Sequence, residues 1–229
     1  MKRGLCLSLA VLALFAAPAA RAQVPPSAAE YASYEGLHAA SAKGDIAAIR
    51  RLAADKNRLN ARDSYGRTPL MVAAHARQYE SAAALMAAGA DVDALERDRY
   101  DVVTIASVAN DPKMLKLVLA GGAKPGQTTS PYDGTALIAA AHLGHVEVVR
   151  TLIAAGAPLD HVNNLNWTAL IESIVLGDGG PDHIACLKAL IDAGADVNIA
   201  DGNGVSPLRL AERNGYDEMV RLLKAAGAK

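Results

Sequence analysis

The chain has 229 residues, with 23 lysines and arginines against 24 aspartates and glutamates and a formal net charge of −1. Its 52% hydrophobic content excludes an intrinsically disordered chain, the absence of a basic excess argues against nucleic acid as a partner, and two cysteines exclude a disulfide-rich scaffold. Aromatic residues make up only 4%, whereas there are 49 alanines. Because alanine supplies little volume and interiors are densely packed, we expect helices in close contact.

The first 22 residues have the pattern of a secretory signal peptide. Lys2 and Arg3 precede an apolar run over residues 5–17, and Ala20 and Ala22 place small side chains where a signal peptidase cleaves. The apolar run is short for a bilayer span, so an N-terminal membrane anchor is the less favoured alternative. We expect cleavage after Ala22 and a periplasmic or secreted protein with a net charge of −4 and no membrane span.

Residues 23–33 predict a flexible or partly helical leader, and a period of about 33 residues organises the chain from residue 34 onward. Each unit opens with a capping residue, continues through an alanine-rich stretch and a second apolar helix, and closes with a Gly-Ala pair. A Thr or Ser hydroxyl accepts a hydrogen bond from the first free amides of a helix, and glycine ends helices in a left-handed conformation. Four openings begin at Thr68, Thr135, Thr168 and Ser206, and the closing pairs at Gly89, Gly122, Gly156, Gly194 and Gly227.

These motifs resemble the ankyrin repeat family. Residues 63–70 (DSYGRTPL) match its opening motif, Gly144 and His145 its middle, and residues 194–198 (GADVN) its end. The resemblance covers nearly all of residues 34–229. It implies an all-α ankyrin-repeat solenoid of helix-turn-helix units with projecting β-hairpin loops. It also implies binding of a protein partner, without catalysis or a cofactor.

We count six repeats, near residues 34–62, 63–95, 96–129, 130–162, 163–200 and 201–229. The first and the last have polar outer faces typical of capping repeats. In repeat three, Asp101 replaces the capping Thr and Asn110 the turn glycine, and both substitutes suit their positions. Arg77 takes the same glycine position in repeat two, which casts doubt on a standard turn there. Repeat five carries five additional residues, 177–181 (GDGGP), which resemble a subset of exported bacterial ankyrin proteins and predict a loop.

Two columns of residues are predicted to line the concave surface of such a solenoid. The column just before the capping residue contains Tyr34, Arg67, Tyr100 and Trp167, and the column one turn further along the first helix contains His75, His142 and Arg213. Aromatic residues and arginine dominate interface energetics, so we expect these seven residues to contact the partner. The alternative is that the aromatic residues brace the next hairpin along the stack.

Metal binding and catalysis are not expected. His75 and His142 lie two repeats, or roughly 20 Å, apart, whereas zinc ligands lie about 2 Å from one ion. The loop at residues 177–183 contains Asp178, Asp182 and His183, but the chain has neither a phosphate-loop pattern nor a Gly-x-Ser-x-Gly motif. A solvated acidic turn is favoured there, and a hydrolase using this loop is the remote alternative.

Cys186 is the only cysteine after the signal, and its position beside a leucine stripe favours a core residue over a redox role. The sequence as a whole predicts an exported, non-enzymatic protein-binding module of one elongated domain. A narrower alternative is a periplasmic protector or inhibitor. The resemblance implies it, because some exported bacterial ankyrin proteins support peroxide resistance alongside catalase and others neutralise toxins.

Overall fold

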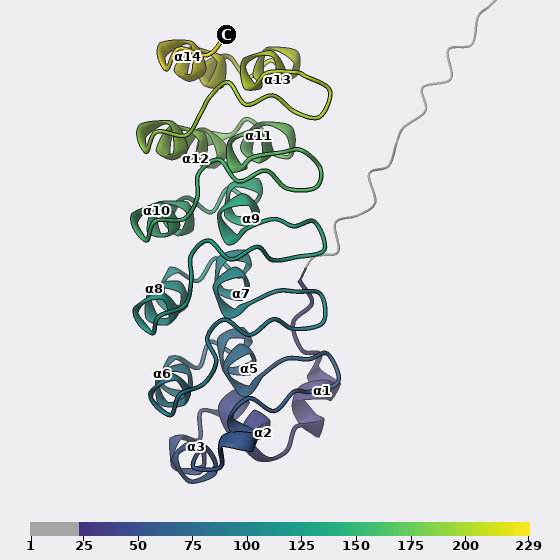
Figure 1. The fold of residues 1–229 in the computed structure, drawn as a ribbon, viewed down its shortest axis with the longest axis vertical. Coiled ribbons are helices and arrows are strands. Elements are labelled where there is room, and N and C mark those ends of the chain that lie inside the picture. The colour runs from purple at the N-terminus through teal and green to yellow at the C-terminus, as the bar shows by residue number, and fades with distance from the viewer. Residues whose placement is uncertain (1–22) are drawn as a thin grey trace, which may run out of the picture.

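The computed structural model describes residues 23–229, so the predicted signal peptide lies outside the described residues. The described part contains helices and no β-strand, as expected for an all-α solenoid (Figure 1). The helices are α1 (Ala28–Ser33), α2 (Gly36–Lys43), α3 (Ile46–Leu52), α4 (Lys56–Leu59), α5 (Pro69–His75), α6 (Tyr79–Ala87), α7 (Val102–Val108), α8 (Pro112–Ala120), α9 (Ala136–His142), α10 (Val146–Ala154), α11 (Ala169–Val175), α12 (Pro181–Asp192), α13 (Pro207–Asn214) and α14 (Asp217–Ala225).

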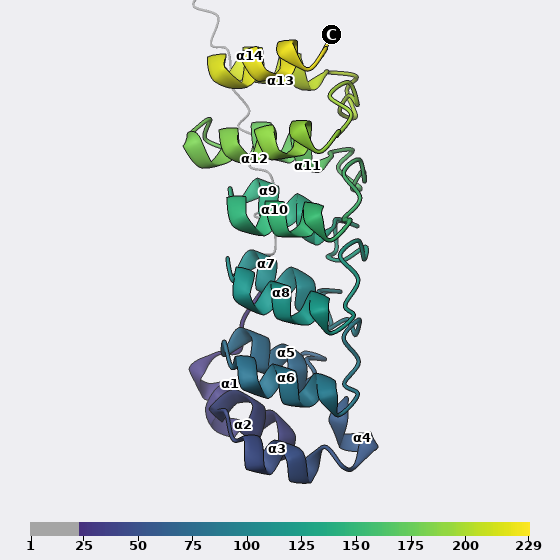
Figure 2. The ribbon, with the colours of Figure 1, turned by 90° about the vertical axis from the view of Figure 1, so that its left-hand side faces the viewer.

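From α2 onward the helices stack as antiparallel pairs, and α4 interrupts the series as a single turn in the first connecting loop (Figures 1 and 2). The first helices of the pairs form an inner row (α2, α5, α7, α9, α11 and α13), and the second helices form an outer row. Most inner helices begin at the predicted caps. The side chains of Thr68, Asp101 and Thr135, for example, each accept a hydrogen bond from the amide three residues later.

In repeats two and four the turn between the two helices of a pair is the same, although glycine occupies it only in repeat four. Gly144 has φ of 69°, and the His145 amide behind it donates to the Ala140 carbonyl at 3.0 Å. Arg77 also has a positive φ, 54°, and the equivalent bond behind it is 2.9 Å long. The doubt that the sequence raised about repeat two was therefore wrong. The surrounding helix pair imposes the left-handed conformation on a side chain that would otherwise avoid it.

The projecting loops are hairpin-shaped, but they consist of turns and contain no regular β-strands within residues 23–229. Each is closed by one recurring backbone bond, such as Asp63 N to Arg67 O or Asn163 N to Trp167 O, both 3.0 Å. Thr129 and Gly134 form an isolated antiparallel bridge. Successive loops are also linked, since Arg97 N donates to Tyr65 O at 2.9 Å.

The core runs along the whole stack between the inner and outer rows. Ala73, Ala106 and Ala140 of the inner helices are at most 1% exposed, so the small side chains lie where neighbouring helices approach most closely. Cys186 is fully buried, as predicted, and burial raises the pKa of its thiol to about 12. Within residues 23–229, no helix has the length and hydropathy needed to cross a bilayer.

The leader, residues 23–33, contains one short helix, α1. Ser27 caps it, because its hydroxyl accepts from the Glu30 amide at 3.2 Å while the Ser27 amide donates to Glu30 Oε2 at 2.9 Å. Figure 1 shows the leader beside the inner row, on the side toward which the hairpin loops project, whereas in Figure 2 the leader and the loops lie at opposite edges of the stack. The leader therefore covers part of the inner row at the N-terminal end of the stack.

Candidate functional site

The concave face, meaning the surface formed by the inner helices and the hairpin loops, is the candidate functional site. The seven predicted partner-contacting residues all lie on inner helices or hairpin loops or, for Tyr34, directly before α2. They differ in exposure. In the N-terminal three repeats Arg67 and Tyr100 are buried and Tyr34 and His75 are partly exposed, whereas in the C-terminal three Trp167 and His142 are partly exposed and Arg213 is exposed.

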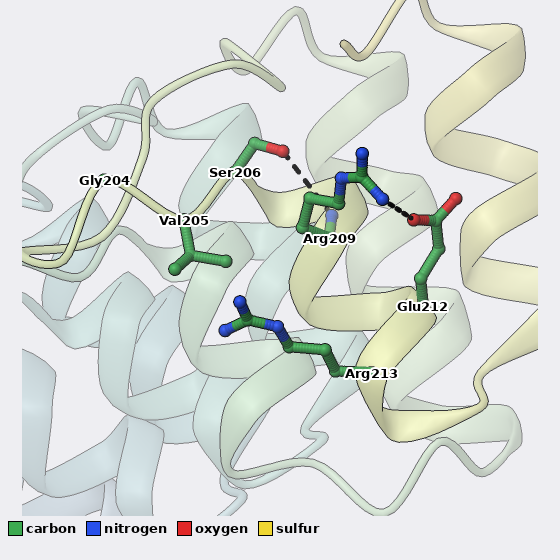
Figure 3. Close-up of a pocket in the computed structure, with 6 residues that line it drawn as sticks. All are labelled: Gly204, Val205, Ser206, Arg209, Glu212 and Arg213. Atoms are coloured by element: carbon green, nitrogen blue, oxygen red, sulfur yellow. Dashed lines mark hydrogen bonds and ion pairs between the residues drawn. The ribbon is translucent and has the colours of Figure 1, made fainter.

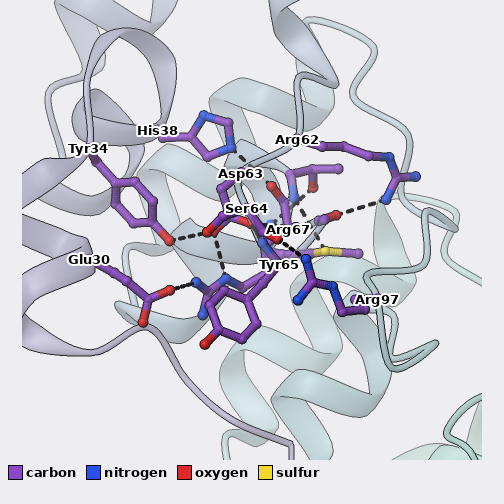
Figure 4. A network of polar contacts seen from close by, with 12 residues as sticks. Glu30, Tyr34, His38, Arg62, Asp63, Ser64, Tyr65, Arg67 and Arg97 are labelled. Atoms are coloured by element: carbon purple, nitrogen blue, oxygen red, sulfur yellow. Dashed lines mark hydrogen bonds and ion pairs between the residues drawn. The ribbon is translucent and has the colours of Figure 1, made fainter.

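Arg67 is 1% exposed and is enclosed by polar and aromatic groups (Figure 4). Its Nε donates to Asp63 Oδ2 at 2.7 Å, its Nη2 donates to Glu30 Oε1 of the leader, and the Tyr65 ring centre lies 4.6 Å from its guanidinium carbon. The predicted contact between Arg67 and an outside partner is therefore not available while the leader is in place. No sequence pattern indicated that Glu30 would reach it.

Tyr34 and Tyr100 fit the alternative of bracing within the stack. The Tyr34 hydroxyl donates to Asp63 Oδ2 in the next hairpin at 2.7 Å, and burial together with this bond raises the pKa of Tyr34 above its usual range. Tyr100 is 7% exposed, and burial raises its pKa to about 12. The Tyr100 ring consequently offers little surface to a partner, which corrects the expectation for that position.

His75, on α5, is partly buried close to the Arg67 network. Burial, with the positive charge of Arg67 as the next cause, lowers the pKa of the His75 imidazole to about 4. The ring is therefore neutral near pH 7. His38 and His145 contact the backbone of the neighbouring repeat, with ring nitrogens 3.0 Å from Arg67 O and 2.9 Å from Ser107 O.

Repeat five contributes to the concave face a buried carboxyl group that the sequence did not identify as part of this surface. Glu172 on α11 is 4% exposed and accepts a hydrogen bond from Asn163 Nδ2 at 3.0 Å. Its Oε2 lies 3.5 Å from His142 Nδ1, too far for a good hydrogen bond, and has no hydrogen-bond partner among the described residues. Burial raises the pKa of Glu172 to about 7 and lowers that of His142.

Asn163 connects this carboxyl group to the hairpin of Trp167. The Asn163 Oδ1 accepts the Trp167 amide at 3.0 Å while its Nδ2 binds Glu172. One signal in the sequence could have identified Glu172, because the inner-helix position four residues after the cap is apolar in repeats two, three, four and six. A charged residue in that otherwise apolar column indicates a local polar arrangement.

The C-terminal end of the concave face holds a pocket of about 480 Å³ (Figure 3). It is lined by Gly204, Val205, Ser206, Arg209, Glu212 and Arg213. Arg209 pairs with Glu212 at 3.3 Å, and Lys224 pairs with the same carboxylate at 3.1 Å. Arg213 is exposed and has no ion-pair or hydrogen-bond partner among residues 23–229, so its charge is available to a ligand.

The glycine-rich loop of repeat five is tied to its neighbours. His183 Nδ1 lies 2.8 Å from Asp178 Oδ1 and its Nε2 lies 2.9 Å from the His142 carbonyl, so both ring nitrogens are engaged. The Tyr216 hydroxyl donates to the Gly177 carbonyl at 3.0 Å. Neither nitrogen is left to act as a general base. The described residues also contain no group of three His, Cys, Asp or Glu side chains placed to hold a metal ion.

Paired helices, a repeating cap-and-turn geometry and a concave face with a pocket define a helical repeat solenoid built for binding. The family model for ankyrin repeats (3 copies) matches residues 15–96 and 103–201. The chain belongs to the ankyrin repeat family. Ankyrin repeats generally mediate protein–protein interactions, and proteins built from them are typically non-enzymatic scaffolds.

Relatives of known sequence or structure have the same architecture. The ankyrin repeat protein YahD of Escherichia coli (strain K12) is 32% identical over 191 residues, which cover 82% of this chain and 94% of YahD. A crystal structure of an ankyrin repeat domain from Acinetobacter baumannii AYE is 45% identical, covers 84% of this chain and 98% of its own, and superposes with a TM-score of 0.79. The ankyrin repeat domain of Bcl-3, an IkappaB family member, is 28% identical, covers 86% and 88%, and has a TM-score of 0.76.

Proposed function

We propose that this protein is an exported, non-enzymatic binding module that holds a protein partner against the concave face of its C-terminal three repeats. The observation that carries the proposal is the division of the predicted contact residues by exposure. Trp167, His142 and Arg213 in repeats four to six are partly or fully exposed, whereas in repeats one to three Arg67 and Tyr100 are buried and the hydroxyl of the partly exposed Tyr34 is engaged by Asp63. His75, also partly exposed, lies beside the Arg67 network.

The accessible groups suit a mixed apolar and acidic epitope. Trp167 offers a large ring on a hairpin held by Asn163, so little conformational entropy is lost when a partner packs against it. Arg213 offers a charge beside the C-terminal pocket, where a carboxylate on the partner can replace water. The two positions lie on consecutive repeats, roughly 10 Å apart along the stack.

Affinity capture from the native host, followed by titration of the purified partner against variants, tests this surface. We expect Trp167→Ala and Arg213→Ala each to weaken binding of the partner about tenfold or more, because tryptophan and arginine side chains contribute most of the binding energy in interfaces. Arg221→Ala is the matched control, since Arg221 is exposed on α14 and its ion pair is with Glu218 of the same helix. If Trp167→Ala and Arg213→Ala bind as the control does, this face is not the interface.

Export is supported by the pattern of residues 1–22 and is tested separately. Cells that express the full chain are fractionated, and the mass of the purified protein is measured. We expect a chain that begins at Gln23 in the periplasmic or secreted fraction. An uncleaved chain in the cytoplasm would contradict the proposal of export while leaving the binding surface unaffected.

A periplasmic protector or inhibitor is the narrower form of the same proposal. It is supported by the signal pattern and by the resemblance of the glycine-rich loop to exported bacterial ankyrin proteins. Gene neighbourhood is the first test, since a catalase or toxin gene beside this one favours that role. The decisive measurement is survival of a deletion strain under peroxide or toxin challenge, with restoration by wild type and not by Trp167→Ala.

A further inference from the structure

We propose that the concave face at Arg67 is a binding site for a carboxylate of an acidic peptide segment, and that Glu30 of the leader occupies this site in the free protein. The proposal goes beyond the interface on repeats four to six. It shares with the proposed function only the premise that the concave face binds protein. Its test uses no natural partner, so either proposal can fail while the other stands.

The first observation is an unsatisfied buried cation. Arg67 is 1% exposed, and its Nη1 has no hydrogen-bond partner among the described residues, although Nε and Nη2 are both engaged. A buried donor without a partner is destabilising, and a guanidinium presents its donors in a planar fork that matches both oxygens of one carboxylate. The Arg67 guanidinium therefore has one donor group, Nη1, for which the described residues supply no acceptor.

The second observation is that Glu30 is an incomplete occupant. Its Oε2 accepts the Ser27 amide at 2.9 Å in the capping box of α1, so only Oε1 is directed to Arg67 (Figure 4). Because the carboxylate is shared between the cap and the guanidinium, it cannot form the two parallel bonds of a bidentate pair. A peptide carboxylate free of the capping constraint can contact Nη1 and Nη2 together, and such pairs are the stronger ones.

The third observation is that the site does not depend on the leader for its shape. Asp63 in the hairpin accepts both the Arg67 side chain at 2.7 Å and the Arg67 amide at 2.8 Å, and Tyr65 covers one face of the guanidinium. Departure of the leader therefore leaves the Arg67 side chain oriented for another acid.

The leader itself is held by few contacts. Helix α1 has six residues, too few to be stable by itself, and Val24 ahead of it is 62% exposed. Besides the Glu30 ion pair, it contributes the burial of Pro26 and an edge contact between the rings of Tyr31 and Tyr34, whose centres are 5.9 Å apart. A segment attached in this way detaches with a small free-energy change, so an acidic peptide can displace it from Arg67.

The first experiment asks whether the carboxylate of Glu30 holds the leader. Glu30→Gln keeps an oxygen for the Ser27 amide and replaces the charged acceptor that faces Arg67 with a neutral NH2 group. Hydrogen exchange of the full chain is expected to accelerate about tenfold at residues 30–34 in this variant, where the amides bond within the leader. Glu80→Gln, at an exposed position of α6, is the control. Unchanged exchange in Glu30→Gln would overturn the proposal.

The second experiment supplies the site with a defined ligand. Two labelled synthetic peptides spanning residues 23–34, one with glutamate and one with glutamine at position 30, are titrated by fluorescence anisotropy. We expect the glutamate peptide to bind the Glu30→Gln protein about tenfold more tightly than the glutamine peptide does, and about tenfold more tightly than it binds wild type, whose own leader competes.

Equal binding of the two peptides to the Glu30→Gln protein would show that no carboxylate is recognised and would refute the site. Adding Arg67→Gln to that protein should abolish the difference between the peptides, and a persisting difference would also refute it. Circular dichroism establishes whether the double variant folds. If it does not, the comparison of the two peptides on the folded Glu30→Gln protein decides the question alone.

Discussion

Two buried carboxyl groups of the concave face respond to pH in opposite directions. For Asp63, burial alone would raise the pKa, but hydrogen bonds from Tyr34 and Arg67 hold it below its usual range. Its stabilising contribution is present above the pKa of the unfolded chain and is lost as the pH falls through the folded value. Glu172 has a single acceptor bond and no cation within hydrogen-bonding distance, so burial dominates and its pKa rises to about 7. The stabilising contribution of the protonated Glu172 side chain to folding is fully present below the unfolded pKa of 4.5 and is lost as the pH rises through 7.

Glu172→Gln should therefore stabilise the protein in a pH-dependent way. The glutamine keeps an oxygen for Asn163 and carries no charge, so the gain should be near zero at pH 4 and should grow through the interval from 4.5 to 7. It should reach about 3 kcal/mol at pH 8. Urea unfolding of both proteins from pH 4 to 8 measures the difference, with Glu80→Gln as an exposed control. A gain that does not change with pH would show that Glu172 is not a buried titrating group.

At the scale of elements, the inserted loop of repeat five acts as a structural tie between repeats. A Cβ placed on Gly179 would lie 2.4 Å from Tyr216 Cδ1, and its φ is +69°. The loop thus packs directly against the turn that begins α14, while His183 holds it to the end of α9. The five inserted residues, which the sequence indicated only as a loop, connect repeats four, five and six together with His183.

Gly179→Ala should destabilise the protein more than a glycine substitution that bears only the backbone cost. Gly204 supplies the control, because its φ is +73° and an added Cβ would meet nothing within 4 Å. Both alanines incur roughly 1–2 kcal/mol for the left-handed conformation, and Gly179→Ala adds the clash with Tyr216. Thermal melts by circular dichroism should show the larger fall in Tm for Gly179→Ala. Equal falls would mean that the loop does not pack on Tyr216 in solution.

At the scale of the molecule, the main helix contacts of residues 23–229 run between adjacent repeats, because each helix pair packs against the pair before it and the pair after it. In such an elongated stack (Figure 2), a weakened repeat depends on its immediate neighbours for support. The same core substitution should consequently have different effects at the centre and at the end.

Leu137→Ala and Leu223→Ala make this comparison with equal chemistry, since both leucines are fully buried. Each should cost about 2–5 kcal/mol locally. In the central repeat the loss should lower the unfolding midpoint measured by circular dichroism and by fluorescence of Trp167, the only tryptophan. In the last repeat it should let α13 and α14 unfold first, so that the circular dichroism transition precedes the fluorescence transition. Coincident and equally shifted curves for both variants would contradict stacking that couples nearest neighbours only.

The features that could be predicted from the sequence depend on residues close together in the chain. Thr68, Asp101 and Thr135 cap helices through bonds that span three residues, and the turn at Gly144 spans five. The repeating pattern of such local signals determined the fold class and the position of the buried Cys186. The repeat register also places the hairpin aromatics in one column. It left open whether they contact a partner or brace the next hairpin.

The tertiary structure determined which residues of the two columns a partner can reach. Arg67 and Arg213 occupy equivalent kinds of position in the two predicted columns, yet the first is buried and the second is exposed. Around Arg67 lie Asp63 and Tyr65 of its own hairpin and Glu30, which contacts it from 37 residues away in the chain. Likewise, Glu172 is enclosed by Asn163 from one loop and by His142 from the preceding repeat. Periodicity determines the lattice on which residues sit, whereas burial and charge pairing depend on contacts between segments that no local pattern encodes.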